Sequence, residues 1–434
     1  MTLEDYLKRD AELYPDKTAV ICGEECCSYR QLLERVTARA ASLRVGVIPF
    51  RASQAIDFLV DYFAIHLAGG VAVPLEKGIP DDLFEEYKCQ LSAATVPAGV
   101  ADVLFTTGTT GKAKGVMISH DTIIADAENL IAAQGFHHEL TFIINGPLNH
   151  IGSLSKIYPV VLVGGTLHII DGMKDANAFF GAMDEGGEQA RFATFLVPAS
   201  IRMLLAFSAS RLASYADKIE FIETGAAPIA LADMQRLCEA LPKSRLYNTY
   251  ASTETGIIAT YDFNHEECLA GCLGKPMRHS QFMITGEGKV ACSGKTLMTG
   301  YWNDEELTRS VLRDGVIYTA DLGEIDNQGR LRLRGRDGDV INVGGYKVIP
   351  TEVEDVALSL PAIKDCICIP VEHRVLGTVL KLLVVLNVGY VLDKRQIALA
   401  LREKLEPYKV PMQYEQVDAI KRTFNGKIDR KAYR

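Results

Sequence analysis

Thr106-Thr-Gly-Thr-Thr-Gly-Lys-Ala-Lys-Gly115 lies directly after an apolar run, residues 101–105, and before a helical pattern that begins near Ser119. Its glycines let the backbone bend closely around a ligand, and its hydroxyl and amide groups can donate hydrogen bonds to phosphate oxygens. The spacing is not that of a Walker A loop, because Thr106 stands where that loop has its first glycine. The pattern favours a phosphate-binding loop over a solvent-exposed polar turn. We expect phosphate contacts from Thr106, Thr107, Gly108, Thr109, Thr110, Gly111, Lys112 and Lys114.

Outward from this loop, short β-branched runs alternate with helical patterns, which predicts an α/β fold with a largely parallel sheet. From about residue 265 the pattern changes to short strands with tight glycine turns, which indicates a small β-rich subdomain. Beyond residue 338 a strand, helix, two strands and a second helix follow. We predict a large N-terminal domain of layered α/β subdomains, residues 1–337, and a small, mobile C-terminal α+β lid domain, residues 338–434.

Composition and charge exclude several classes of function. Lys and Arg number 46 against 55 Asp and Glu, so the net charge is −9. Broad binding to nucleic acid or to an anionic membrane would require a basic face, so neither is expected. The sequence has no apolar run of the roughly 18 residues that cross a bilayer, and it begins with polar residues. The ten cysteines lack paired metal spacing and are interpreted as reduced thiols, which favours the cytoplasm.

The order of residues in the 106–115 loop resembles the signature of the adenylate-forming superfamily, which includes acyl- and aryl-CoA synthetases, peptide adenylation domains and luciferases. Members usually carry Thr-Ser-Gly-Thr-Thr-Gly-x-Pro-Lys-Gly, so Thr107 and Ala113 are mild departures. The segment 147–152 resembles the wall of the family's acyl pocket, where many CoA ligases have a histidine, here His150. A capping or core histidine is the alternative. The run 225–228 resembles the loop along the nucleotide, which implies cofactor contacts from Gly225, Ala226 and Ala227.

The segment 247–256 resembles the family's Tyr-Gly-x-Thr-Glu element, with Ala251 in place of the glycine. An aromatic face at Tyr250 can stack on a purine, and the amide of Asn248 can hydrogen-bond to its edge. Thr253 can donate to the α-phosphate, and Glu254 offers a hard carboxylate oxygen to Mg²⁺. We therefore expect this segment to hold the base and the metal.

Three later segments continue the resemblance in the family's order. Asp321, in 318–323, would accept hydrogen bonds from both ribose hydroxyls, and Arg336 would also reach the ribose. Gly338 occupies the family's hinge position, and its backbone permits a large change of dihedral angles. Lys427, in 423–430, matches the family's catalytic lysine. A bare backbone at Gly344 and Gly345 suits a narrow channel for a thiol, although such a pair is also a common turn.

The resemblance covers roughly residues 18–431 and implies an acid–thiol ligase that uses ATP, Mg²⁺ and coenzyme A. The enzyme would activate a small-molecule carboxylic acid as acyl-AMP, release pyrophosphate and transfer the acyl group to coenzyme A. One alternative is a stand-alone adenylation enzyme that loads the phosphopantetheine thiol of an acyl carrier protein. Another is a non-catalytic nucleotide-binding relative, against which the presence of Lys427, Glu254 and Asp321 argues.

The acid itself is less constrained by the sequence. Amino-acid-activating relatives usually carry an Asp in the wall segment, whereas 149–153 has no carboxylate, so a free α-amino acid is not expected. The wall and the apolar run 154–163 most resemble those of aryl or o-succinylbenzoate-type CoA ligases, and a medium-chain fatty acid fits almost as well. The segment between Pro74 and Ala101 is shorter than in most relatives.

Overall fold

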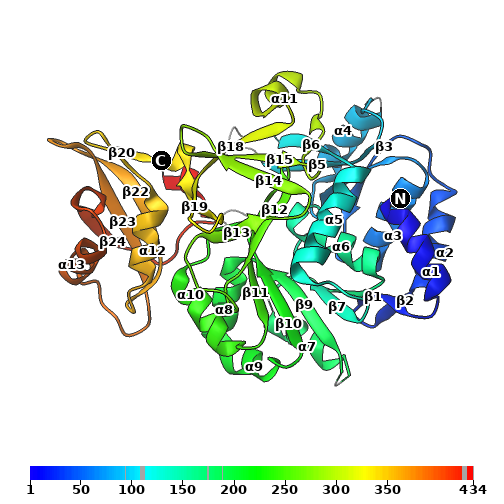
Figure 1. Ribbon diagram of the computed structural model, residues 1–434, viewed down its shortest axis with the longest axis horizontal. Coiled ribbons are helices and arrows are strands. Elements are labelled where there is room, and N and C mark those ends of the chain that lie inside the picture. Colours follow the sequence, from blue (N-terminus) through cyan, green and yellow to red (C-terminus); the bar gives the residue numbers. More distant parts are fainter. Residues whose placement is uncertain (93, 108–112, 174, 188, 423–427, 434) are drawn as a thin grey trace.

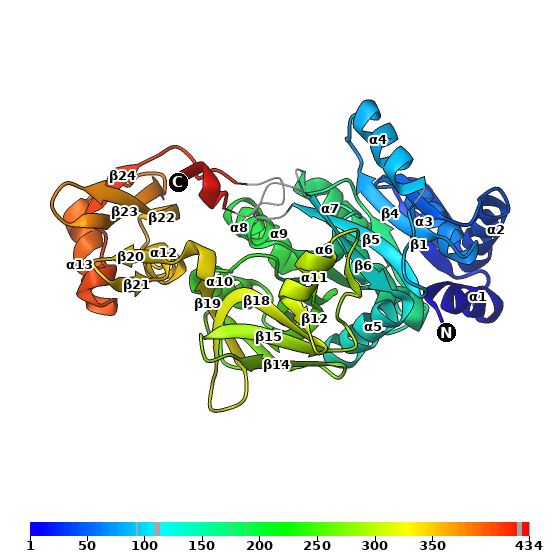
Figure 2. The ribbon, with the colours of Figure 1, turned by 90° about the horizontal axis from the view of Figure 1, so that it is seen from above.

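The computed structural model describes residues 1–92, 94–107, 113–173, 175–187, 189–422 and 428–433. A large N-terminal part carries two sheets with their helices, and a smaller C-terminal part lies beside one end of it (Figures 1 and 2). The long sheet of the large part has the order β14-β15-β18-β19-β13-β12-β11-β10-β9-β7-β8-β1-β2. The predicted α/β class, with a large domain and a small α+β domain, is confirmed.

One half of the long sheet is parallel, from β11 to β1. These strands are rich in buried β-branched and aromatic residues because helices cover both faces of the sheet. Their carboxyl ends meet at one edge, which is where ligands bind in open α/β sheets. The strands are β1 (Thr18–Cys22), β7 (Leu140–Ile144), β8 (Thr166–Ile169), β9 (Arg191–Leu196), β10 (Ile219–Thr224) and β11 (Arg245–Ser252), and β2 (Glu25–Ser28) pairs antiparallel with β1 at the border.

The other half of the long sheet is antiparallel, from β11 onward. The β-rich subdomain expected from about residue 265 is therefore a continuation of the same sheet. Its hairpins turn at the predicted glycine positions, since Gly288 and Gly329 both have positive φ. The strands are β12 (Gly256–Asp262), β13 (Cys272–Pro276), β14 (Ser280–Ile284), β15 (Lys289–Gly294), β17 (Leu312–Arg313), β18 (Val316–Ile325) and β19 (Leu331–Arg336).

A second sheet of the large part has the order β16-β6-β5-β4-β3. The sequence pattern did not predict β6, because its seven residues begin inside the glycine-rich loop and run up to the predicted helix, so they look like the approach to that helix. Val116 and Ile118 of β6 are buried against the core, and this tertiary contact favours the extended conformation. The strands are β3 (Val47–Ala52), β4 (Val71–Glu76), β5 (Val100–Thr107), β6 (Ala113–Ser119) and β16 (Gly300–Tyr301).

Local capping signals explain where several helices begin and end. Ser28 and Gln31 form a capping box at the start of α2, and Ser119 caps α5. Gly135 and Gly164 end α5 and α6 in the left-handed conformation. The helices of the large part are α1 (Leu3–Leu13), α2 (Tyr29–Ala40), α3 (Ile56–Leu67), α4 (Asp81–Ser92), α5 (His120–Gln134), α6 (Ile151–Val163), α7 (Ala176–Asp184), α8 (Pro198–Phe207), α9 (Ala209–Ser214), α10 (Leu231–Ala240) and α11 (Glu305–Val311).

The C-terminal part has its own core, in which Val348, Val353, Leu382 and Leu401 are buried. A short 3₁₀ turn, Asp337–Asp339, joins β19 of the large part to β20. The elements that follow are β20 (Ile341–Val343), β21 (Tyr346–Val348), α12 (Pro350–Leu358), β22 (Ile363–His373), β23 (Gly377–Leu386), α13 (Lys394–Lys404), β24 (Gln413–Gln416) and two further 3₁₀ turns, Pro407–Lys409 and Arg430–Tyr433.

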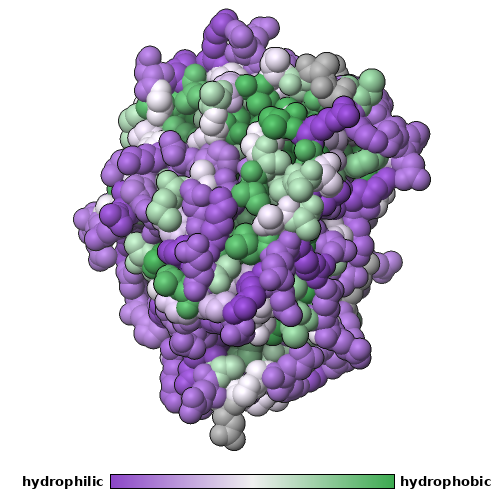
Figure 3. All heavy atoms as spheres, turned by 90° about the vertical axis from the view of Figure 1, so that its right-hand side faces the viewer, coloured by the Kyte–Doolittle hydropathy of each residue, from purple (hydrophilic) through white to green (hydrophobic). Residues whose placement is uncertain are grey.

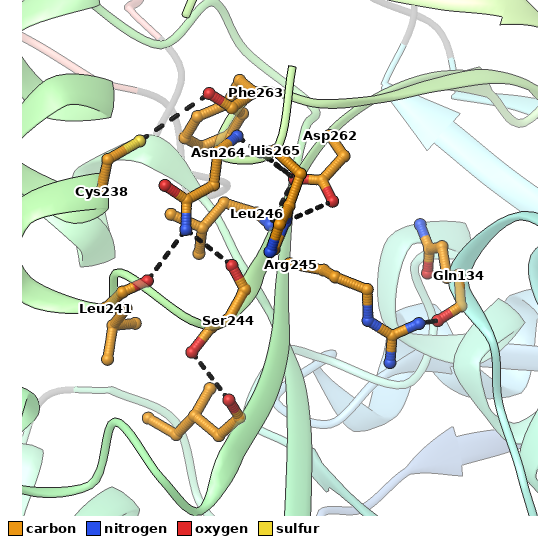
Figure 4. A network of polar contacts seen from close by, with 11 residues as sticks. Gln134, Cys238, Leu241, Ser244, Arg245, Leu246, Asp262, Phe263, Asn264 and His265 are labelled. Carbon is orange, nitrogen blue, oxygen red and sulfur yellow. Dashed lines mark hydrogen bonds and ion pairs between the residues drawn. The ribbon is translucent and has the colours of Figure 1, made fainter. Parts of the chain in front are cut away.

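A polar network holds the end of β11 that is remote from the carboxyl edge (Figure 4). Asp262 Oδ1 accepts hydrogen bonds from the backbone N–H groups of Leu246 and Asn264, both at 3.1 Å. The amide of Asn264 donates to the carbonyls of Leu241 and Ser244 at 2.9 and 2.7 Å. These contacts hold the loop between α10 and β11 against the end of β12. They restrain the start of β11 and therefore the position of its carboxyl end.

The face of the molecule at the right-hand side of Figure 1 is mostly hydrophilic, with apolar residues in a broken band between polar ones (Figure 3). Within the part of the chain that the structure describes, none of the helices is both long enough and apolar enough to span a bilayer.

Candidate active site

The glycine-rich loop begins in β5 and ends in β6, two antiparallel neighbours. Thr106 pairs with Lys114, and Thr107 with Ala113, so the two strands bring both ends of the loop together. Lys114 Nζ lies 5.5 Å from the centre of the Tyr301 ring, a cation–π contact. The predicted contact residues Gly108, Thr109, Thr110, Gly111 and Lys112 fall outside the described residues.

The loop after β10 lies at the carboxyl edge of the parallel strands. β10 and β11 are parallel neighbours, with Thr224 opposite Asn248. A side chain at Gly225 would sit 2.9 Å from the carbonyl oxygen of Thr249, so this close approach requires glycine. Ala226 has φ +65°, a conformation that costs an L-residue roughly 1 kcal/mol, and its side chain is exposed. Gly225, Ala226 and the half-buried Ala227 thus form a bent backbone beside the end of β11.

Three predicted nucleotide contacts meet directly. The hydroxyl of Tyr250, on β11, donates to Asp321 Oδ2 at 2.8 Å, and Arg336 Nε donates to Asp321 Oδ1 at 2.8 Å. Asp321 and Arg336 are opposite residues of the antiparallel pair β18–β19. Burial and the neighbouring Asp321 carboxylate raise the pKa of Tyr250, and attraction to Asp321 raises the pKa of Arg336. The carboxylate is therefore held in one orientation and still has lone pairs for further donors.

The Asn248 side chain is more deeply buried than we expected from the sequence. Its side chain is 5% exposed, and its amide donates to the Cys272 carbonyl at 3.0 Å. This bond joins β11 to β13 and fixes the orientation of the amide, so the base-reading role assigned to Asn248 stays a prediction.

Tyr301, a residue that was not predicted from the sequence, contacts both Glu254 and Lys114. The hydroxyl of Tyr301, on β16, donates to Glu254 Oε1 at 2.9 Å, and its ring carries the Lys114 contact. Burial and the Glu254 carboxylate raise the pKa of Tyr301, so the hydroxyl stays protonated and acts as a donor. Thr253, next in the chain, is half-buried. Tyr301 lies 47 positions after Glu254, and its segment is held there by the backbone hydrogen bond from Met298 N–H to the Glu254 carbonyl, at 2.8 Å, and by the pairing of β16 with β6.

We expect Tyr301→Phe to lower kcat/KM for ATP roughly tenfold, because one hydrogen bond to a carboxylate contributes about 1.5 kcal/mol or more. The ring remains, so the fold and the Lys114 contact are retained. Initial rates across a Mg²⁺ titration would measure the loss.

Tyr215→Phe is the matched control, because Tyr215, the residue directly after α9, also donates its hydroxyl to a carboxylate, that of Asp184, in an exposed hydrogen bond. An unchanged Mg²⁺ dependence in Tyr301→Phe would contradict the role given to Tyr301.

The predicted acyl wall lies at the start of α6. His150 is the residue before the helix and is half-buried. Close behind it, the Phe195 ring at the end of β9 is flanked by two glycines: a side chain at Gly152 or Gly225 would come within 3.4 and 3.5 Å of the ring. The wall is thus an aromatic face between the helix and the loop after β10.

A buried ion pair closes the inner end of this wall. Lys156 Nζ lies 2.8 Å from Glu223 Oε1 and 2.7 Å from Oε2, and the two side chains are 3% and 1% exposed. Lys156 Nζ also lies 5.4 Å from the centre of the Phe195 ring. Asn145, Ser153, Lys156 and Phe195 are among the residues that line a narrow hollow here. This ion pair was not predicted from the sequence, although a single lysine in the apolar run 154–163 indicates a buried charge that needs an acidic partner.

The remaining predicted residues belong to the C-terminal part. Gly344 and Gly345 form the exposed turn between β20 and β21, both with positive φ, and the structure does not place them in the cluster around Asp321. Lys427 falls outside the described residues. Arg422 and Ile428 form a β-bridge on either side of the 423–427 segment, and Arg430 Nη2 lies 2.6 Å from Glu354 Oε2.

Arg422, the residue before the 423–427 segment, lies on the face of the C-terminal part that contacts the large domain. Asp365, on β22, is bridged by Arg422 at 2.7 Å and by Arg202 of α8 at 3.5 Å. Since α8 directly follows β9, this contact brings the flank of the tail to the same side of the large domain as the carboxyl edge.

The chain matches the family model described as AMP-binding enzyme over residues 87–302, and the model described as AMP-binding enzyme C-terminal domain over residues 352–427. It is 26% identical to the indoleacetate–CoA ligase of Aromatoleum aromaticum, with 99% of this chain and 96% of the relative covered. It is 25% identical to the 2-succinylbenzoate–CoA ligase of Bacillus cereus, with 100% and 98% covered.

The fold is similar to that of ATP-bound MatB from Rhodopseudomonas palustris, with a TM-score of 0.87 at 22% identity over 100% of this chain and 98% of that one. Both family models match in the order expected from the motifs, and the likeness extends over the whole length of the relatives named above. The chain belongs to the AMP-binding enzyme family, which confirms its resemblance to the adenylate-forming enzymes.

Proposed function

We propose that this chain is an AMP-forming acyl- or aryl-CoA ligase. It activates a carboxylic acid as acyl-AMP with release of pyrophosphate and then transfers the acyl group to coenzyme A. The observation that carries the proposal is the direct contact of Tyr250, Asp321 and Arg336, three family-motif residues from three strands, beside the bent backbone of 225–227. The CoA ligases named above, which match along their whole length, support it.

The first half-reaction brings two anions together. The acid's carboxylate attacks the α-phosphorus of ATP, a P–O bond to the β-phosphate breaks, and pyrophosphate leaves. Positive charge and N–H donors must therefore lie where charge accumulates. Lys427 bridges the carboxylate and the α-phosphate, Thr253 donates to the α-phosphate, and the 106–114 loop holds the pyrophosphate. No general base is required, because the carboxylate is already ionised at neutral pH.

The residues around Glu254 fit a Mg²⁺ ion that enters with ATP. A carboxylate held by Tyr301 through one oxygen keeps the other available as a hard ligand, and Mg²⁺ favours sites with one carboxylate plus phosphate oxygens. When bound, the ion neutralises phosphate charge. Asp321 accepts the ribose hydroxyls with lone pairs that Tyr250 and Arg336 leave open, and the Tyr250 ring stacks on the base.

The acid is an aryl or arylalkyl acid with a polar group at its far end. The Phe195 ring between Gly152 and Gly225 offers a flat apolar face to a ring, and His150 stands at the entrance. The inner end is the Lys156–Glu223 pair, whose charged groups can hydrogen-bond to a polar terminus of the acid but not to a methyl terminus. This favours the aryl or succinylbenzoate type over a medium-chain fatty acid.

After adenylation the C-terminal domain rotates and coenzyme A attacks the adenylate, releasing AMP. We place the domain boundary at 337–338 and the hinge at Gly338, which the 3₁₀ turn between β19 and β20 supports. Asp337 and Asp339 flank the hinge and hold Lys289 at 3.1 Å and Arg430 at 3.5 Å. Each pair lies within one domain, Lys289–Asp337 in the large domain and Asp339–Arg430 in the C-terminal domain, so neither has to break when the domain turns at Gly338. Gly344 and Gly345 then line the passage for the thiol.

We also propose a cytoplasmic location. Each of the ten cysteines, all of them among the described residues, is a free thiol, and this supports a reducing compartment.

ATP–pyrophosphate exchange with a panel of acids, with and without coenzyme A, tests the function. We expect exchange with aryl acids that end in a polar group, weaker exchange with medium-chain fatty acids and none with free α-amino acids. Thioester should form with free coenzyme A.

Thioester formed only with a phosphopantetheine carrier protein would instead identify a carrier-loading enzyme. ATP binding without exchange for any acid would identify a non-catalytic relative.

A further inference from the structure

Three side chains that commonly bind metals meet in the N-terminal part, away from the adenylation residues. Glu4 lies in the first turn of α1, His66 in the last turn of α3, and His120 is the first residue of α5. One ligand atom of each lies within 4.8 Å of those of the others. Figure 1 shows these three helices grouped at the N-terminal end of the molecule, so the cluster joins segments far apart in the sequence.

Each of these side chains carries a buried polar atom without a hydrogen-bond partner among the described residues. The atoms are Glu4 Oε2, His66 Nδ1 and His120 Nδ1. Glu4 is 9% exposed and His66 3% exposed, so water gives them little compensation. A buried unpaired polar group costs roughly 1–3 kcal/mol, and three at one place need a common explanation.

A second layer of contacts orients His66. Its Nε2 lies 2.9 Å from Asp102 Oδ1, and the Tyr62 hydroxyl donates to Asp102 Oδ2 at 2.8 Å. Asp102 is fully buried on β5. A histidine that binds a metal through one ring nitrogen usually donates the other N–H to a carboxylate in this way, which fixes the tautomer and leaves Nδ1 as the ligand.

We propose that Glu4, His66 and His120 bind one divalent transition-metal ion of the Zn²⁺ class, with a water molecule completing the coordination. Two imidazoles and one carboxylate are a donor set that suits Zn²⁺ at about 2.0–2.2 Å per bond. Side-chain adjustments of about an ångström bring each of the three ligand atoms to that distance from the ion. The ion ties α1 to α3 and α5, and its role is structural, because the residues lie outside the adenylation site.

The alternative is a buried network of carboxylates and imidazoles with no ion. In that case the three residues would stabilise the fold equally with and without metal, and removal of one would not change metal binding.

Zinc titration of untagged, chelator-treated protein separates the two. The titration is done without ATP and with excess Mg²⁺, so that the nucleotide site cannot take up the zinc. We expect one Zn²⁺ per chain by elemental analysis and an increase of several degrees in Tm when zinc is added. Cobalt(II) substituted for zinc should give the visible ligand-field bands of a four- or five-coordinate ion.

Glu4→Gln and His120→Gln should each weaken zinc binding at least about tenfold and abolish the Tm increase, while the metal-free proteins keep wild-type circular dichroism. His265→Gln is the matched control, because His265 also pairs with a carboxylate, Asp262 at 2.9 Å, at the surface (Figure 4). Zinc isotherms and Tm shifts that are the same in the wild type, the control and both variants would overturn the proposal. So would a wild-type protein that takes up no zinc.

Discussion

Lys427→Ala is expected to lower the rate of ATP–pyrophosphate exchange by at least about 100-fold, while thioester formation from supplied acyl-adenylate stays close to wild type. The reason is electrostatic, because the ammonium group is assigned to the point where the acid's carboxylate meets the α-phosphate. Once the adenylate exists, that charge is no longer needed. The measurement compares the two half-reactions in the same preparation.

Lys431→Ala is the control, since Lys431 lies four residues further along the same tail and its side chain is exposed. It removes an equal charge from the tail and should leave both half-reactions unchanged. Equal loss of both half-reactions in Lys427→Ala would show that the lysine has another role.

Lys156→Met is expected to destabilise the large domain by about 3–5 kcal/mol, because it leaves the Glu223 carboxylate buried without its partner. Asp126 is a second buried carboxyl group, and the positive charge of Lys156 acts on it. Burial raises the pKa of Asp126 to about 7, against the opposing effects of the Ile257 N–H and of Lys156. Urea unfolding followed by the fluorescence of Trp302, the chain's single tryptophan, reports on the domain that contains the pair.

The double variant Lys156→Met/Glu223→Leu should recover most of the lost stability, since replacing both members of a buried pair with apolar groups is often nearly neutral. Lys243→Met is the matched control. Its partner Asp217 lies 2.8 Å away, but both side chains are more than three-quarters exposed, so the unfolding midpoint should hardly move. A double variant as unstable as Lys156→Met would contradict this account.

Most of the fold could be predicted from sequence patterns, because runs such as 101–105 and the helical pattern from near Ser119 carry strong local signals. The structure places them in β5, Val100–Thr107, and α5, His120–Gln134, within a residue or two at the predicted ends. β6 was not predicted, because its extended conformation depends on pairing with β5 and β16. The long sheet was predicted as two units, since the pairing of β11 with β12 that joins them leaves no mark in local composition.

In the candidate site, too, residues that belong to local motifs were predicted, whereas contacts between distant segments were not. Tyr250, Asp321 and Arg336 were found from motifs and do meet in the structure. Tyr301 and the Lys156–Glu223 pair were missed, because each depends on a partner more than 40 residues away. Asn248 was assigned to the base, whereas its amide is bonded to the Cys272 carbonyl.

The sequence alone predicts which chemical groups this chain carries and in what order: an expected phosphate-binding loop, a Thr-Glu pair, an expected ribose-binding carboxylate, an expected hinge and a lysine in the tail. Such short runs of residues act through local backbone shape, so they can be recognised without knowledge of the fold. The three-dimensional structure was needed to find which groups lie together, which carboxylate pairs with which cation, and that Glu4, His66 and His120 face one another. The reason is physical: hydrogen bonds and ion pairs act over a few ångströms, and the pairing of distant strands and helices sets those distances.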